Sequence, residues 1–116
     1  MSGKRKLTLE QGATWSRVLT WEIPRGVPVD LSNYSARMQI RETYESSTPL
    51  LSLTTAVGGG ITLGGAAGTI TIVVSAAITA TLLPGNHVYD IELVSAGGVV
   101  TRLLEGQMTI TPEVTR

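Results

Sequence analysis

The stretch Ser35-Ala36-Arg37-Met38-Gln39-Ile40-Arg41 decides the fold class of this chain. Its apolar and polar side chains alternate, so that Ala36, Met38 and Ile40 share one face while the polar residues share the other. Strict alternation is typical of a β-strand with one buried and one solvated face, whereas a helix would scatter both sets around its circumference. The stretch therefore predicts a half-buried strand.

The same alternation recurs along most of the chain. Strands are predicted at residues 7–10, 15–23, 68–73, 88–93, 99–104 and 107–111, and the glycine-rich residues 57–68 are expected to form two tight turns around a further brief strand. Pro112 should end the last strand because proline has no amide hydrogen to donate. In total, about seven to nine strands at regular spacing predict a sandwich of two antiparallel sheets.

The alternation also predicts the core and the one departure from strand structure. The inward residues should form the core: Met38, Ile40, Ile70, Ile72, Tyr89, Ile91, Met108 and Ile110. Residues 75–83 break the alternation and are rich in alanine, so we expect one short helical turn near residues 76–82. We expect a single sandwich domain over residues 11–116, preceded at residues 1–10 by an N-terminal arm or edge strand.

Composition and charge exclude several classes of partner. Nine basic residues balance nine acidic ones, which removes the positive field that binds nucleic acid or anionic lipid, so neither nucleic acid nor a membrane is expected as a partner. Only 16% of residues are charged, against about 25% in an ordinary soluble domain. The low fraction indicates that other proteins cover part of the surface.

Catalytic and metal-binding patterns are missing from the sequence. The chain has no cysteine and one histidine, His87, so we expect no metal and no cofactor. The glycine-rich stretch lacks the lysine and hydroxyl residue of a phosphate-binding loop. Asp90 and Glu92 would form an acid–base site only if a pocket converged on them and His87, which we expect to be a solvated or locally hydrogen-bonded turn residue. We therefore predict that the protein is not an enzyme.

Two tryptophans leave a choice open. Trp15 and Trp21 lie on the same side of a regular strand, where they either fill the core or, in one case, anchor a partner. A carbohydrate-binding module is a competing interpretation, because β-sandwiches often carry such sites. It would need at least two solvent-facing aromatic residues on one face.

Candidate protein-contact residues lie in two places. The basic run Lys4, Arg5 and Lys6 is either a solvated tail or a segment that docks on an acidic protein surface, and the alternating Leu7 and Leu9 would suit a strand added to a neighbouring chain. Arg37 and Arg41 form a polar stripe that is either solvated or paired with a neighbour's carboxylates. No catalytic, cofactor-binding or metal-binding residue is proposed.

Several of these segments, taken in order, resemble small virion proteins of tailed bacteriophages, in particular the immunoglobulin-like N-terminal domain of baseplate upper proteins. The residues that carry the resemblance are 26–34, 36–41, 68–72, 85–93 and 104–110. The resemblance implies an immunoglobulin-like β-sandwich. It also implies a structural role in the virion, after synthesis in the host cytoplasm, with other virion proteins and copies of itself as partners.

The chain ends soon after the last strand, without a fibre-forming segment, which favours a connector in the tail or baseplate over a receptor-binding protein. A capsid decoration protein is the alternative within the same class.

Overall fold

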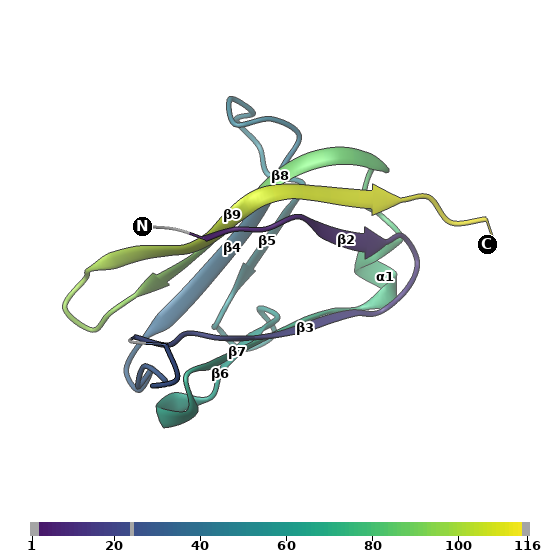
Figure 1. The fold of residues 1–116 in the computed structure, drawn as a ribbon. Helices are drawn as coiled ribbons and strands as arrows, with labels where there is room; N and C mark the ends of the chain where they lie inside the picture. The colour runs from purple at the N-terminus through teal and green to yellow at the C-terminus, as the bar shows by residue number, and fades with distance from the viewer. Residues whose placement is uncertain (1–2, 24, 115–116) are drawn as a thin grey trace.

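The computed structural model describes residues 3–23 and 25–114 and contains two β-sheets that form a sandwich (Figure 1). The larger sheet has the order β1-β9-β8-β4-β5, with β2 also paired to β9, and the smaller sheet has the order β3-β7-β6. The strands are β1 (Gly3–Lys4), β2 (Leu7–Glu10), β3 (Trp15–Thr20), β4 (Ser35–Arg41), β5 (Leu51–Thr54), β6 (Ile61–Leu63), β7 (Thr69–Val74), β8 (Gly85–Val94) and β9 (Val100–Thr111). The predicted all-β sandwich is confirmed.

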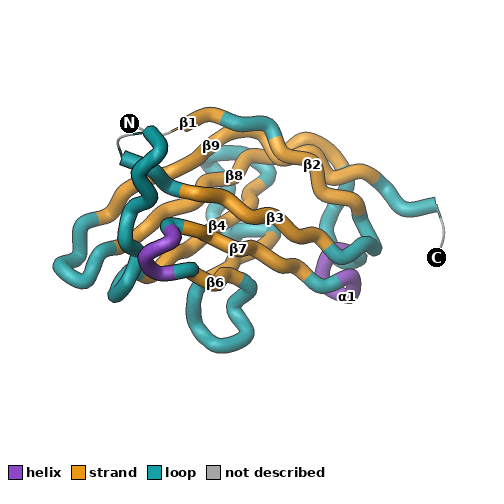
Figure 2. Tube along the Cα trace, turned by 60° about the horizontal axis from the view of Figure 1, so that its bottom comes forward, coloured by secondary structure: helices purple, strands orange, loops and turns teal. Residues whose placement is uncertain are grey.

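The order of the strands is that of an immunoglobulin-like domain. The first long strand of the smaller sheet, β3, pairs with β7 and then β6, while β9, β8, β4 and β5 form the opposite sheet, so the chain crosses repeatedly between the layers. Neighbouring strands run antiparallel except at the N-terminus, where β1 and β2 run parallel to β9. Figure 2 shows the smaller sheet in front of the larger one, with the short helix at one end.

The core contains every residue that the alternation assigned to it. All eight predicted core side chains are buried, and they form one cluster together with Trp15, Leu31, Ala36, Leu53 and others from both sheets. Burying a large aliphatic side chain contributes about 1.5–3 kcal/mol, so this shared apolar layer is the main force that holds the sheets together. Because the core lies between the sheets, the outer face of each sheet is left for contact with solvent or with other proteins.

Among the residues that the structure describes, helical structure is confined to two short segments. Helix α1 (Ala76–Thr79) begins where Ser75 caps it, because the Ser75 hydroxyl accepts a hydrogen bond from the Ile78 amide. The Thr79 hydroxyl donates to the carbonyl of Ala13 at 2.8 Å, which ties α1 to the β2–β3 connection. The predicted helical turn is confirmed, and a 3₁₀ turn, η1 (Gly65–Ala67), lies within the glycine-rich stretch.

Some strand limits differ from the prediction. β3 ends at Thr20 instead of residue 23, because the Ile23 amide turns back to the carbonyl of Val27. β9 is one continuous strand where two were expected, and a register shift opposite it between Ile91 and Glu92 absorbs the irregularity. Strand β5 was not predicted.

The N-terminal segment belongs to the sandwich itself. Leu7 and Leu9 of β2 are buried in the core, so the expectation that they contact a neighbouring chain is wrong for this structure. The segment is an edge strand of the chain's own sheet because two apolar side chains at alternate positions are worth more inside the core than in water. None of the helices among the described residues is long and apolar enough to cross a bilayer.

Candidate protein-contact surfaces

The residues of a conceivable acid–base site do not converge. His87 is buried in β8, on the inner face, whereas Asp90 and Glu92 of the same strand project outward. The Nε2 atom of His87 donates a hydrogen bond to the carbonyl of Leu83 at 2.8 Å, and its Nδ1 atom is buried without a partner. The expectation of a turn residue is therefore wrong, although the local hydrogen bond is present. Alternation along β8 separates these side chains by the thickness of the sheet.

The outer face of the larger sheet carries a network of charges, which we call the charged face. It consists of Arg37 and Gln39 with Arg41 on β4, Asp90 and Glu92 on β8, and Arg102 and Glu105 on β9. The Arg37 Nε atom lies 2.7 Å from Glu92, while Arg102 lies 3.6 Å from Asp90 and 3.9 Å from both Glu92 and Glu105. Arg102 thus lies within 4 Å of three carboxylates.

This crowding of carboxylates perturbs Asp90. Partial burial raises the pKa of the Asp90 carboxyl, and the nearby negative charge of Glu92 raises it further, against the opposing effect of Arg102. In the loop between β3 and β4, hydrogen bonds from Ser32 hold the pKa of the Asp30 carboxyl below its usual value. Both shifts arise from ordinary neighbours, so they give no sign of a catalytic acid or base.

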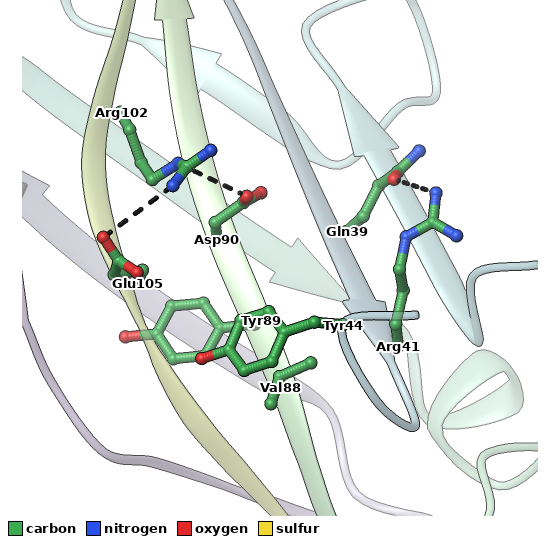
Figure 3. A pocket seen from close by; sticks show the side chains of 8 residues that line it. All are labelled: Gln39, Arg41, Tyr44, Val88, Tyr89, Asp90, Arg102 and Glu105. Atoms are coloured by element: carbon green, nitrogen blue, oxygen red, sulfur yellow. Dashed lines mark hydrogen bonds and ion pairs between the residues drawn. The ribbon is translucent and has the colours of Figure 1, made fainter. Parts of the chain in front are cut away.

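A small open pocket of about 250 Å³ lies on the charged face beside the β4–β5 loop (Figure 3). Tyr44, which is 71% exposed, and Val88 form its apolar part, while Asp90 and Glu105 lie on the opposite side with Arg102. Arg41 donates to the carbonyl of Ser46 at 2.6 Å and to the Gln39 side chain at 2.8 Å. The pocket is therefore bounded by side chains that already bond one another.

The two arginines proposed as contact residues both have partners within the chain. Arg37 pairs with Glu92, and Arg41 is held by Ser46 and Gln39, so neither side chain needs a neighbour's carboxylate to be satisfied. Their role in contacts with another protein remains a prediction.

The basic run is exposed, but its backbone is fixed. Lys4, Arg5 and Lys6 lie at the edge of the larger sheet with exposed side chains. The Arg5 amide donates to the carbonyl of Glu105 at 3.0 Å, and the Arg5 carbonyl accepts from the Tyr89 hydroxyl at 2.7 Å. The backbone of this segment is therefore part of the sheet. Whether its three basic side chains stay solvated or dock on another protein remains a prediction.

The outer face of the smaller sheet carries no charge, and we call it the uncharged face. Its residues are Ser16, Val18 and Thr20 on β3, Thr69, Thr71 and Val73 on β7, and Thr62 on β6. Val18 is 61% exposed and Val73 is 46% exposed. Val18 lies opposite Thr71 on the adjacent strand, and Val73 is two residues farther along that strand, so the two valines are diagonal neighbours. Such a surface buries well against another protein because no charge has to lose its water.

A signal for this face is present in the sequence but was not used. Residues 46–89 contain no aspartate, glutamate, lysine or arginine, and they supply β5, β6, β7 and α1. A run of this length without charge builds two of the three strands of the smaller sheet. Charge counted by segment, and not over the whole chain, would have indicated an uncharged region, although not that β3 completes the face.

The aromatic residues do not form a sugar-binding platform. Trp15 and Tyr89 are buried, and Trp21 packs edge-on against Tyr34 with ring centroids 6.1 Å apart. Tyr44 is the one strongly exposed ring among the five aromatic residues of the chain, all of which the structure describes. The two solvent-facing rings that a carbohydrate-binding module requires are therefore not found on any one face.

Within residues 3–23 and 25–114, no cluster of three or more histidine, cysteine, aspartate or glutamate side chains is placed to hold a metal ion. Neither a protein-family model nor a curated protein matches the sequence. Among solved structures, the chain is similar to CopC from Methylosinus trichosporium OB3b, at 14% identity and a TM-score of 0.48, covering 99% of this chain and 90% of that one. This similarity adds no functional information.

Proposed function

We propose that this chain is a structural component of a bacteriophage virion, a connector of the tail or baseplate that acts through contacts with other proteins and not through catalysis. The observation that supports this most is the uncharged face, where exposed Val18 and Val73 lie among threonine and serine side chains. Domains that remain free in solution carry about 25–35% charged residues on their surface. A sheet face without charge is typical of a surface that another protein covers.

The location in the virion follows from the resemblance to immunoglobulin-like domains of baseplate proteins. The partners are other virion proteins and copies of the chain itself, and the connector needs no cofactor, nucleic acid or membrane. The absence of a converging acid–base pair around His87, Asp90 and Glu92 supports a role without catalysis.

The test starts from particles of the phage whose genome encodes the chain. Mass spectrometry of gradient-purified particles should detect the protein, and gold-labelled antibodies should place it on the tail. Labelling of the capsid would identify a decoration protein instead. Absence of the protein from the purified particles would refute the proposed virion role.

A matched pair of variants then asks which face is used. Thr71→Lys places a charge on the uncharged face, and Gln39→Lys adds the same charge to the charged face. We expect Thr71→Lys to reduce incorporation into particles by about tenfold or more, because a buried unpaired charge is costly, and Gln39→Lys to leave it unchanged. Equal incorporation of both variants would contradict a contact through the uncharged face.

A further inference from the structure

Strand β3 is an open edge of the smaller sheet. It pairs with β7 on one side, and no other described strand pairs with it on the other side. The Trp21 amide, just past the strand, donates to the carbonyl of Gly68 at 2.9 Å in the same register. Because hydrogen bonding alternates along an antiparallel ladder, the odd-numbered residues bond to β7. The backbone groups of Ser16, Val18 and Thr20 therefore point outward, toward an edge where no described strand pairs with β3.

The other long edges of the sandwich are protected. At the N-terminal edge, the carbonyl of Thr8 accepts hydrogen bonds from the side chains of Trp15 and Arg17, at 2.9 and 3.4 Å, and the basic run follows the same edge. At the opposite edge, the Thr54 amide is taken by the carbonyl of Gly59 as the chain turns back. Lysine side chains and covering loops are devices that prevent strands from adding to an edge. β3 has no lysine, proline or covering turn, and its one charged side chain is Arg17, which bonds the Ser16 carbonyl.

We propose that β3 pairs antiparallel with β3 of a second copy of this chain, around a two-fold axis at Val18. This inference rests on the proposed function, in which the chain acts through protein contacts, and names one of the partners. The axis places Val18 opposite Val18 of the second copy and Ser16 opposite Thr20, so that apolar meets apolar and hydroxyl meets hydroxyl. It places Arg17 opposite Leu19, and no like charges oppose each other. The two smaller sheets become one continuous six-stranded sheet, and the uncharged face doubles in extent.

Arg17 controls access to this edge. Its guanidinium donates to the carbonyl of Ser16 at 2.9 Å and lies 5.2 Å from the centre of the Trp15 ring. The Ser16 carbonyl is one of the acceptors that the second strand needs, so pairing has to displace this hydrogen bond. Arg17→Ala is therefore expected to strengthen the dimer, the opposite of what loss of an interface residue would do.

Disulfide trapping tests the axis directly, because the natural chain has no cysteine. In a hydrogen-bonded antiparallel pair the two Cα atoms are about 5.5 Å apart, which lies within the range that a disulfide spans. Val18→Cys should form a covalent dimer under mild oxidation. The control, Val73→Cys, lies on the same face but on the central strand and should remain a monomer. Cross-linking of the two variants at equal rates would overturn the proposed axis.

Sedimentation of the full-length protein over a concentration series tests the pairing without oxidation. We expect Val18→Lys to raise the dimer dissociation constant by about tenfold or more, Arg17→Ala to lower it, and Val73→Lys to change it by less than about twofold. A wild-type chain that stays monomeric up to about 1 mM overturns the pairing. If such a monomeric chain is nevertheless found in purified particles, the connector role stands without the pairing. If instead the chain dimerises but is absent from particles, the pairing stands and the connector role is refuted.

Discussion

The outer faces of the two sheets have the same strand geometry and opposite chemistry. On the charged face, β4, β8 and β9 alternate buried apolar residues with arginine and carboxylate residues, which pair with one another. On the uncharged face, β3 and β7 alternate similar buried residues with threonine, serine and valine. The inner faces are equivalent because they share one core. The difference teaches that the inward residues determine the fold, while the outward residues determine what each face can contact.

The largest effect on stability is expected when a charged residue replaces an apolar residue on the inner face of a sheet. Ile91→Asp places a charge without a partner inside the core, which should cost at least about 4 kcal/mol and prevent folding. Val73→Asp, an outward position, should change the free energy of unfolding by no more than about 0.5 kcal/mol. Circular dichroism and thermal melting of both variants provide the measurement. A soluble Ile91→Asp protein with an unchanged melting temperature would refute the assignment of the core.

A second, smaller effect is expected at the closed edge of the larger sheet. A Cβ atom at Gly106 would lie 2.3 Å from the carbonyl oxygen of Arg5, so Gly106→Ala should push the N-terminal strand away at a cost of about 1–3 kcal/mol. Tyr89→Phe removes only the hydroxyl that bonds to Arg5 and should cost about 1 kcal/mol. Chemical denaturation gives both values, and hydrogen exchange of residues 3–10 should quicken in both variants. Unchanged exchange in Gly106→Ala would contradict the close approach.

The charged face should contribute little to stability. Arg37→Ala breaks the ion pair with Glu92, but the arginine side chain is more than half exposed, so we expect a loss of at most about 1 kcal/mol. The loss should shrink further at high salt, because ions screen exposed charges. Denaturation of both proteins at low and high salt measures it. A loss several times larger would mean that the network helps to hold the sheet together.

The smallest effect is expected from Asp90 and depends on pH. Because its pKa is raised in the folded state, the folded protein holds this proton more tightly than the unfolded chain does. The contribution of Asp90 therefore favours folding below the ordinary aspartate pKa and is lost as the pH rises through the raised value. Asp90→Asn should have a slightly higher melting temperature than the wild type at neutral pH. The difference in melting temperature between the two proteins should become smaller in acid. A lower melting temperature at neutral pH would contradict the shift.

The sequence was sufficient for the parts of the fold that depend on local alternation. Large aliphatic residues at every second position, such as Met38 and Ile40, identified strands and core because no other element buries that pattern. The parallel pairing of β2 with β9 could not be predicted, since the choice of a strand's partner depends on contacts about a hundred residues apart. β5 was missed because its four residues, Leu51–Thr54, are too short and follow a polar loop.

The contact surfaces were harder to predict than the fold. The contact residues predicted from the sequence included charged ones such as Lys4 and Arg37, because charged residues are conspicuous in a sequence. The surface that we propose is instead defined by what it lacks over residues 46–89, and its position on one face becomes apparent only when β3 joins β7. His87 was placed outside the core because glycine and proline precede it, yet β8 begins before it, at Gly85.

The parallel pairing of β2 with β9 also determines how the domain carries mechanical load. β1 and β2 run alongside β9 in the same direction, so that the start of the N-terminal segment and the C-terminal end of β9 point to opposite sides (Figure 1). Tension applied through the two ends acts along these strands in opposite directions. The hydrogen bonds of the ladder are then sheared together instead of being unzipped one after another. A domain joined in this way transmits a pull from one neighbour to the next before its core begins to open.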